Sequence, residues 1–519
     1  MNGAESLVKT LLASGVDTVF ANPGTSEMHF VAALDREPGM RCILCLFEGG
    51  TSGAADGYFR MTRRVAATLL HLAPGFGNAF ANLHNARKAG SGVLNVMGEH
   101  ASYHLRHESP LKGDTVGISQ AVSHWTRVSQ DATGVAVDGA AAVTAARAMG
   151  GQVATLILPA NTAWEAAVGP EVAEAPPALR RPSAAMIEGA AQALLEPGAA
   201  LMVDGAALYT DLGLVAARIA ARTGARLMAP FFSARQRRGG GSLRLTRLAY
   251  EVDQNLGIMA DVQALVLVGA ERPTAFFAYP GKPSLNEAPG TRVVELAHAE
   301  MDLDWTLHAL AAAVGAEGVA LGADAFVPLA VPEVPSGSLT LDKVGQAVAA
   351  LLPAEAVVVN EAITSGAPMA MALATARPHD WLITMGGAIG GALPSAVGVA
   401  VACPDRKVLV LSGDGSAMYT LQSLWTMARE GLDVTVVIFA NHVYKILHGE
   451  LAAVGAQFEL GAGRNVARMF DMVEPKLDWV ALAKGHGVAG VHCATTAEFV
   501  AAFGAAMATK GPHLIAVEC

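Results

Sequence analysis

The stretch Lys407-Val-Leu-Val-Leu-Ser-Gly-Asp-Gly-Ser416 sets a strand of apolar residues directly before an aspartate that lies between two glycines. An uninterrupted Val/Leu run is typical of a strand covered on both faces, as in a parallel sheet. Ligands of open α/β sheets bind beyond the carboxyl ends of the strands, which is where Asp414 falls. The glycines let backbone N–H groups approach an anion, and Mg²⁺ prefers hard oxygen ligands such as a carboxylate. The stretch therefore predicts an anion-binding and metal-binding strand end.

The next apolar run, Val434-Thr-Val-Val-Ile-Phe439, leads into Asn441, which lies 27 positions after Asp414. An Asp-Gly pair after a strand is by itself an ordinary turn. Parallel strands joined by a helix are usually neighbours, so we expect Asp414 and Asn441 to lie close together. Two side-chain oxygens, a backbone carbonyl and a diphosphate would complete an octahedral Mg²⁺ site.

The whole chain alternates short apolar strands with Ala-rich helical segments, and two proline-bearing stretches, Glu174 to Pro182 and Val331 to Gly337, divide it. Such alternation favours an α/β fold with parallel sheets. We therefore predict three doubly wound parallel-sheet domains in the 519 residues. Their expected bounds are 1–175, 184–330 and 339–519.

Composition excludes several classes of function. The net charge of −10 argues against a nucleic-acid partner, because such proteins concentrate basic residues on one face. The mean hydropathy is +0.37, yet no apolar run reaches the roughly 18 residues of a membrane span. The first residues carry no charged segment before a signal core, so we expect a cytoplasmic protein.

The segment from Gly413 to Trp425, followed by Asn441, resembles thiamine diphosphate (ThDP) enzymes of the 2-oxo acid decarboxylase and acetolactate synthase family, most closely their benzoylformate decarboxylase branch. The resemblance implies that Asp414 and Asn441 bind Mg²⁺ through side chains, and Val443 through its carbonyl. It implies further cofactor contacts from Gly415, Ser416, Thr364 and Tyr444.

Two more motifs resemble the same family. Glu48, in Phe47-Glu-Gly-Gly-Thr-Ser-Gly-Ala-Ala-Asp-Gly-Tyr58, matches the carboxylate that hydrogen-bonds to the pyrimidine ring and activates the cofactor. Without the motif, such a glutamate would be an exposed or helix-capping residue. The loop Thr384-Met-Gly-Gly-Ala-Ile-Gly-Gly-Ala-Leu-Pro394 matches the one that bends the cofactor. Gly387 and Ile389 would contact it there.

The substrate side also resembles benzoylformate decarboxylases. Leu70-His71-Leu-Ala-Pro-Gly-Phe-Gly-Asn78 matches a segment whose histidine transfers protons, with Asn78 at the cofactor. His71 would be a general acid. The alternative interpretation is a structural histidine that is hydrogen-bonded in the core. Asn22-Pro-Gly-Thr-Ser-Glu27 places Thr25 where the branch has a serine that binds the substrate carboxylate.

Departures from that branch change the expected substrate. The central stretch Arg272-Pro-Thr-Ala-Phe-Phe-Ala-Tyr279 has no second active-site histidine. Ile446 stands where the branch has alanine, and with Leu447 it would narrow the pocket. We therefore expect decarboxylation of a small or aliphatic 2-oxo acid through an enamine intermediate, with benzoylformate kept as an alternative and carboligation as a further outcome.

His100, His104 and His107 leave two interpretations open. The spacing of His104 and His107 suits a metal site, whereas a loop at the edge of the active site suits the Ser, Tyr and Pro residues around them. We predict that His100, directly after the strand Val93-Leu-Asn-Val-Met97, lines the substrate pocket.

The central domain carries no FAD fingerprint, so we expect no FAD. Its basic stretch Arg235-Gln-Arg-Arg-Gly-Gly-Gly241 is either a solvated loop or a nucleotide-phosphate site. The alternatives to a decarboxylase are an acetolactate synthase-like carboligase and an inactive cofactor-binding assembly partner. In this family the cofactor lies between two subunits, so the resemblance implies a homodimer, paired into a homotetramer.

Overall fold

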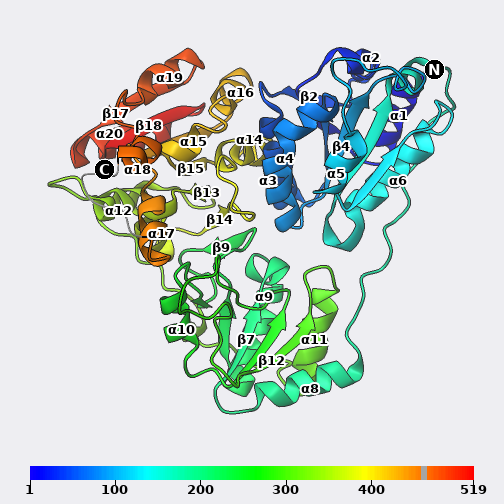
Figure 1. The fold of residues 1–519 in the computed structure, drawn as a ribbon. Helices are drawn as coiled ribbons and strands as arrows, with labels where there is room; N and C mark the ends of the chain where they lie inside the picture. The colour runs from blue at the N-terminus through cyan, green and yellow to red at the C-terminus, as the bar shows by residue number, and fades with distance from the viewer. Residues whose placement is uncertain (457–463, 519) are drawn as a thin grey trace.

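The computed structural model describes residues 1–456 and 464–518, and it consists of three α/β units, each built on its own sheet (Figure 1). In Figure 1 the first and third units lie side by side, with the central unit beneath them. Apolar clusters cover both faces of every sheet, which confirms the predicted fold of three doubly wound domains.

The first sheet is entirely parallel, with the order β2-β1-β3-β4-β6-β5. Its strands are β1 (Thr18–Ala21), β2 (Arg41–Leu44), β3 (Ala66–Leu70), β4 (Val93–Glu99), β5 (Trp125–Val128) and β6 (Val153–Pro159). Its helices are α1 (Gly3–Ala13), α2 (Met28–Asp35), α3 (Glu48–Thr62), α4 (Leu72–Lys88), α5 (Thr115–Gln120), α6 (Val135–Arg147) and α7 (Ala160–Trp164). β3 and β4 are buried along their whole length, so the residues that follow them emerge at the middle of the sheet edge.

The central sheet is also parallel, with the order β10-β8-β7-β11-β12. Its strands are β7 (Ala199–Val203), β8 (Arg226–Ala229), β10 (Thr246–Arg247), β11 (Ala264–Val268) and β12 (Arg292–Ala297). Helices α8 (Ala184–Leu194), α9 (Leu212–Thr223), α10 (Val252–Met259) and α11 (Leu303–Val314) surround it.

The third sheet has the order β17-β18-β16-β15-β13-β14-β9. Its parallel strands are β13 (Val357–Glu361), β14 (His379–Ile383), β15 (Val408–Gly413), β16 (Val434–Ala440), β17 (Ala489–Cys493) and β18 (His513–Glu518). Its helices are α12 (Leu341–Leu351), α13 (Gly366–Ala372), α14 (Ala392–Ala402), α15 (Asp414–Ala417), α16 (Ser423–Arg429), α17 (Lys445–Ala453), α18 (Arg464–Phe470), α19 (Trp479–Gly485) and α20 (Thr496–Ala508).

The expectation that the basic stretch 235–241 is a solvated loop is wrong for its first half. Residues Gln236–Arg238 form β9, an antiparallel edge strand that the central segment of the chain adds to the third sheet beside β14 (Figure 1). Arg235 forms an ion pair with the buried Asp380, at 2.8 Å between Nε and Oδ1. The guanidinium groups are therefore occupied by protein carboxylates and aromatic rings, and no phosphate is needed to account for them.

Helices α3 and α14 join the first and third units. A Cβ on Gly398 would lie 1.8 Å from the carbonyl oxygen of Ala54, and one on Gly57 would lie 2.0 Å from that of Ser395. Only glycine allows the two backbones to approach this closely. The small residues of the Glu48 motif therefore build a helix crossing, and every residue of α3 from Glu48 to Arg60 is buried.

None of the helices within residues 1–456 and 464–518 is both long and apolar enough to cross a membrane.

Candidate active site

The carboxyl ends of β3 and β4 hold the first group of candidate residues. His71 directly follows β3 and begins α4 as its N-cap residue. The next residue, Leu72, has φ of +45°, a conformation that costs a branched side chain free energy and that clusters at functional sites. The tight turn holds the imidazole at the sheet edge, where its side chain is 20% exposed.

Glu27 is the functional residue that the sequence interpretation missed. Its carboxylate is buried and accepts the backbone N–H of Gly24 at 2.8 Å. Nδ1 of His71 lies 3.0 and 3.1 Å from its two oxygens. A Cβ on Gly98 would lie 1.7 Å from Glu27 Oε1, so the carboxylate rests on the bare backbone of β4. Glu27 therefore fixes the orientation of His71, as carboxylates do for catalytic histidines.

Thr25 lies in the same short 3₁₀ turn, Thr25–Glu27, but it is exposed. The hydroxyl nearest to His71 belongs to Ser26, whose Oγ lies 3.3 Å from Nδ1 and which also donates to Glu27. The role of Thr25 in holding a substrate carboxylate stays a prediction.

Glu48 is the first residue of α3 and is buried. Asn78 donates its side-chain N–H to Glu48 Oε2 at 2.9 Å, so the structure brings these two predicted residues together. A Cβ on Gly75 would lie 3.0 Å from Glu48 Oε1 and 3.1 Å from Cβ of His71. One glycine therefore separates the carboxylate from the histidine, and a larger residue would push them apart.

His100 follows β4, and its Nε2 lies 3.0 Å from the Ser109 hydroxyl. The ring centroids of His100 and His104 are 5.6 Å apart, as are those of His104 and His107. His104 and His107 are exposed. No cluster of three or more His, Cys, Asp or Glu side chains in the described part of the chain could hold a metal ion. The three histidines lie in the irregular segment that follows β4. The placement of His100 in a substrate pocket stays a prediction.

The ends of β15 and β16 hold the second group. The two strands pair in parallel, with Gly413 opposite Phe439, so the predicted meeting of Asp414 and Asn441 occurs. Asp414 is buried and accepts the N–H groups of Gly415, at 2.8 Å, and His442, at 2.7 Å. Burial raises the pKa of its carboxyl, which these hydrogen bonds partly offset. Within residues 1–456 and 464–518 no Lys or Arg pairs with it, so the carboxylate has the surroundings of a cation ligand.

The chain after β16 is shaped by a strained turn. His442 has φ of +55°, and its Nε2 lies 3.3 Å from Glu518 Oε1. Asn441 Oδ1 accepts the N–H of Val443 at 3.0 Å. Tyr444 packs on Gly415, since a Cβ there would lie 2.5 Å from its ring. Glycine is therefore required beside Asp414, where the tyrosine ring crosses the backbone.

The loop 384–391 is held by the carboxamide of Asn85 and the carboxylate of Glu361. Asn85, near the end of α4, donates to the Ala388 carbonyl at 2.8 Å. The buried Glu361 accepts the Gly391 N–H at 3.0 Å and the Thr384 hydroxyl at 2.9 Å. Burial raises the pKa of the Glu361 carboxyl. No motif in the sequence had indicated Glu361 as a residue of the site. Gly387 has φ of +73° and is exposed, although one side of it lies against the ring of Phe276.

The remaining predicted residues surround this second group. Ile389 and Thr364 are half-buried, and Thr364 follows Ile363, which has φ of +45°. Ser416 is buried in α15. Ile446 and Leu447 lie in the first turn of α17, next to Tyr444.

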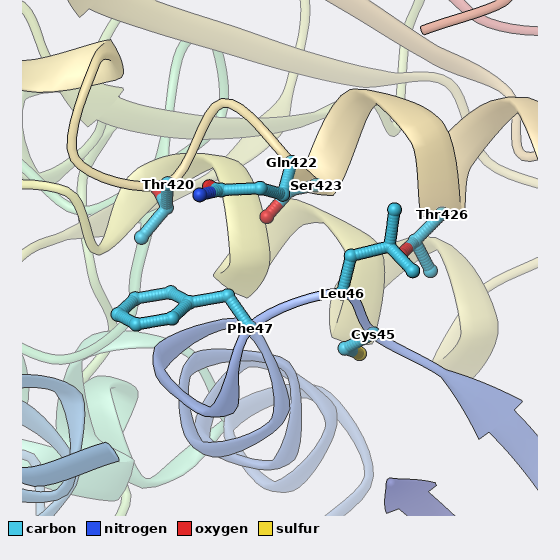
Figure 2. A pocket seen from close by; sticks show the side chains of 8 residues that line it. Cys45, Leu46, Phe47, Thr420, Gln422, Ser423 and Thr426 are labelled. Carbon is cyan, nitrogen blue, oxygen red and sulfur yellow. The ribbon is translucent and has the colours of Figure 1, made fainter. Parts of the chain in front are cut away.

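A narrow crevice lies between the start of α3 and the α15–α16 region, beside Glu48 (Figure 2). In Figure 2, Phe47 faces Thr420 and Gln422 across it. Its lining comes from both units: Cys45, Leu46, Phe47, Gly50, Thr420, Gln422, Ser423 and Thr426. Burial raises the pKa of the Cys45 thiol to about 12, so this cysteine stays a neutral packing residue.

Two family models match this chain. The thiamine pyrophosphate enzyme N-terminal TPP binding domain matches residues 1–120, and the C-terminal TPP binding domain matches residues 364–517. A relative from Mycobacterium tuberculosis, which carries the provisional name acetolactate synthase large subunit IlvX, is 46% identical over 523 residues, covering 100% of this chain and 99% of its own. The chain therefore belongs to the thiamine pyrophosphate enzyme family, and thiamine diphosphate is its cofactor.

A more distant relative and a solved structure carry benzoylformate decarboxylase names. The benzoylformate decarboxylase of Pseudomonas aeruginosa is 26% identical over 560 residues, covering 97% of this chain and 96% of its own. Among solved structures, the 4-hydroxybenzoylformate decarboxylase of Rhodococcus jostii superposes with a TM-score of 0.82 at 24% identity, covering 100% of this chain and 99% of its own. That similarity supports the fold.

Proposed function

We propose that the protein is a ThDP- and Mg²⁺-dependent enzyme that decarboxylates a small or aliphatic 2-oxo acid. The observation that carries the proposal is the Glu27–His71 pair, separated from the buried Glu48 by a single glycine. When bound, ThDP supplies the carbanion and the electron sink for loss of CO₂. A decarboxylase also needs a proton donor beside the cofactor, and the oriented imidazole supplies one.

Each residue of the first group has a distinct task in this proposal. Glu48 would hydrogen-bond to the pyrimidine nitrogen, and its contact with Asn78 keeps the carboxylate directed. His71 would deliver the proton that completes the aldehyde, and Glu27 would hold the ring in the orientation that this transfer needs. The aldehyde then leaves, and His71 regains a proton from solvent through its partly exposed face.

The second group fits a divalent cation. Asp414 and Asn441 would hold Mg²⁺ through side-chain oxygens and Val443 through its carbonyl, which is the hard oxygen set that the ion prefers. No Lys or Arg pairs with the buried Asp414 in the described residues, and its one basic neighbour there is the imidazole of His442, whose Nδ1 lies 3.8 Å from Oδ2. A bound cation would compensate the charge of the carboxylate. The carbonyl of Val443 already accepts the N–H of Lys445 at 2.8 Å, and its second lone pair would serve the ion.

The expected size of the substrate follows from two side chains in the first turn of α17. Ile446 and Leu447 begin this helix next to Tyr444, and two branched side chains there leave less room than alanine would. No histidine lies within residues 272–279, so an aryl ring would find Phe276 and Phe277 in place of a second imidazole. We therefore expect pyruvate or an aliphatic 2-oxo acid to be preferred to benzoylformate.

A second candidate is acetolactate formation, in which the acyl group is passed to a second 2-oxo acid. The name of the relative at 46% identity favours it. The Glu27–His71 pair favours aldehyde release instead, because a histidine next to the cofactor protonates the reacting carbon before a second carbonyl arrives.

The active unit in this proposal is a homodimer, further paired into a tetramer. No hydrogen bond or ion pair joins Glu48, Asn78 or His71 to Asp414, Asn441 or Val443 in the described residues of one chain. Large apolar side chains beside each group are exposed: Leu46 is 46% exposed and Tyr419 is 54% exposed. A partner chain that covered them would bring Glu48 of one protomer to Asp414 of the other.

The test uses purified protein with ThDP and Mg²⁺, and measures CO₂ release together with aldehyde and acyloin products for pyruvate, longer aliphatic 2-oxo acids and benzoylformate. CO₂ and aldehyde in equal amounts support the decarboxylase, whereas acetolactate as the main product favours the synthase. ThDP binding by calorimetry with no CO₂ from any acid would identify an inactive binding protein.

Glu48→Gln serves as the matched variant. It should keep ThDP affinity but slow exchange of the thiazolium C2 proton by orders of magnitude, and an unchanged exchange rate by NMR would exclude Glu48 from the proposed role.

A further inference from the structure

Helix α17 is held by few contacts. None of its residues, Lys445–Ala453, is buried, although it directly follows the proposed metal ligands and carries Ile446 and Leu447. An amphipathic helix without a buried face depends on specific polar contacts for its position. His448 provides one packing contact, edge-on to Phe470 with ring centroids 5.1 Å apart. The second anchor of α17 comes from the central domain of the same chain.

Glu450 receives two tyrosine hydroxyls from the central domain. Tyr250 donates to its Oε1 at 3.1 Å and Tyr279 at 3.3 Å. The two tyrosines come from separate central loops, 200 and 171 positions away from Glu450. Burial raises the pKa of both phenols, and the Glu450 charge raises it further. Both hydroxyls therefore stay protonated as donors over the physiological pH range, and the carboxylate receives two charge-assisted bonds.

The same central loops reach the cofactor-bending loop. The ring of Tyr250 packs against Phe276 with centroids 5.3 Å apart. A Cβ on Gly387 would lie 2.8 Å from the far end of the Phe276 ring, so phenylalanine covers this glycine directly. One group of central side chains thus touches both Gly387, at the proposed cofactor, and Glu450, on the helix of the proposed substrate pocket.

We propose that Tyr250, Tyr279 and Glu450 form an interdomain latch that positions α17, so that the central domain sets how far Ile446 and Leu447 project over the bound cofactor. The latch residues are positioning residues, since they act on substrate through α17. The inference rests on the proposed function, because it deepens the account of which 2-oxo acids the same site accepts.

The experiment compares three variants of the full-length holoenzyme. Tyr250→Phe/Tyr279→Phe removes both donors and keeps the aromatic packing, and Glu450→Gln keeps the helix but removes the charge. Tyr209→Phe is the matched control, because Tyr209 is a central tyrosine with no side-chain hydroxyl bond in the described residues and its ring lies under Arg235. Hydrogen exchange of residues 445–453 and the kcat/KM ratio of pyruvate to a longer aliphatic 2-oxo acid are measured for each.

We expect faster exchange in α17 and a change of about tenfold in the selectivity ratio, because a single methylene in an apolar pocket is worth about 10- to 200-fold. ThDP affinity and the Tyr209→Phe enzyme should match wild type. Unchanged exchange in the double variant overturns the latch, and faster exchange with an unchanged selectivity ratio overturns its role in specificity.

The exchange measurement also separates this inference from the proposed function. If the wild-type holoenzyme releases no CO₂ from any 2-oxo acid, the proposed decarboxylation fails. Faster exchange of α17 in the latch variants would in that case still establish the contact between the tyrosines and Glu450. A wild-type enzyme that is active, with α17 exchanging at the same rate in all variants, overturns the latch and leaves the decarboxylase standing.

Discussion

Replacing Glu27 by glutamine should lower kcat/KM about tenfold and leave ThDP binding unchanged. The carboxylate oxygens lie 3.0 and 3.1 Å from His71 Nδ1, and both also accept other donors. Glutamine keeps one acceptor and turns the other into a donor. A hydrogen bond to a charged group contributes about 1.5–3 kcal/mol and a neutral one about 0.5–1.5 kcal/mol, so roughly 1 to 1.5 kcal/mol of orientation is lost. At 1.36 kcal/mol per factor of ten, the rate falls about five- to tenfold.

The assay is steady-state CO₂ release with the best 2-oxo acid, together with ThDP affinity by calorimetry. Gly98→Ala provides an independent variant, since its Cβ would lie 1.7 Å from Glu27 Oε1 and must displace the carboxylate without altering any charge. It should reduce kcat/KM by a similar factor. Glu37→Gln, at a partly exposed carboxylate paired with Lys9 in the same domain, is the control and should stay at the wild-type rate.

The reasoning is refuted if Glu27→Gln keeps kcat/KM within a factor of two while His71→Ala abolishes turnover. Glu27 would then be a structural carboxylate that happens to lie beside the histidine. A loss of ThDP affinity in Glu27→Gln would also contradict the argument, because in the described residues the carboxylate contacts its own turn, His71 and the backbone of Gly98, and none of the proposed cofactor ligands.

Three further outcomes are expected. Burial raises the pKa of Asp204 to about 7 from its ordinary 3.8, so its contribution to stability is full below pH 3.8 and is lost as pH rises through 7. In Asp204→Asn this pH-dependent loss of up to ~4 kcal/mol in the free energy of unfolding should disappear. The plot of the thermal midpoint against pH should then become flatter. Gly398→Ala would place Cβ 1.8 Å from the Ala54 carbonyl and should cost about 1–3 kcal/mol or more by urea unfolding, whereas Gly189→Ala, with open space around it, should not destabilise. Ile446→Ala should raise turnover of benzoylformate relative to pyruvate about tenfold, and equal ratios would show that this side chain does not limit the pocket.

The sequence predicted what is local along the chain. Asp414 and Asn441 could be paired because both follow strands, and parallel neighbours bring such ends together. Period and spacing carry this information because a strand and the residue after it are continuous in sequence. Glu48 and His71 were assigned through the resemblance of their motifs to the family, since a glutamate or a histidine after an apolar run is by itself ordinary.

What the sequence did not predict depends on contacts between distant segments. Glu27 rests on Gly98, and nothing in Asn22-Pro-Gly-Thr-Ser-Glu27 tells that a bare backbone from β4 will lie beneath it. The only local signal was the glycine three residues before the carboxylate, whose N–H it accepts. β9 was missed because three charged or polar residues have no apolar period, and its strand conformation comes from pairing with β14.

The central domain consequently takes a larger part than a spacer would. Arg235, which precedes β9, bonds to Asp380 of the third sheet and donates to the carbonyls of Arg60 and Met61 at the end of α3. Burial opposes ionisation of Asp380, but Arg235 and Arg406 lower its pKa, so the carboxylate stays charged and bound. One side chain thus ties together all three units. α3 begins at Glu48, and β15 of the third sheet ends directly before Asp414. The Arg235 contacts therefore add to the α3–α14 crossing in fixing these two residues relative to each other within a chain, which is the geometry that a second protomer must meet.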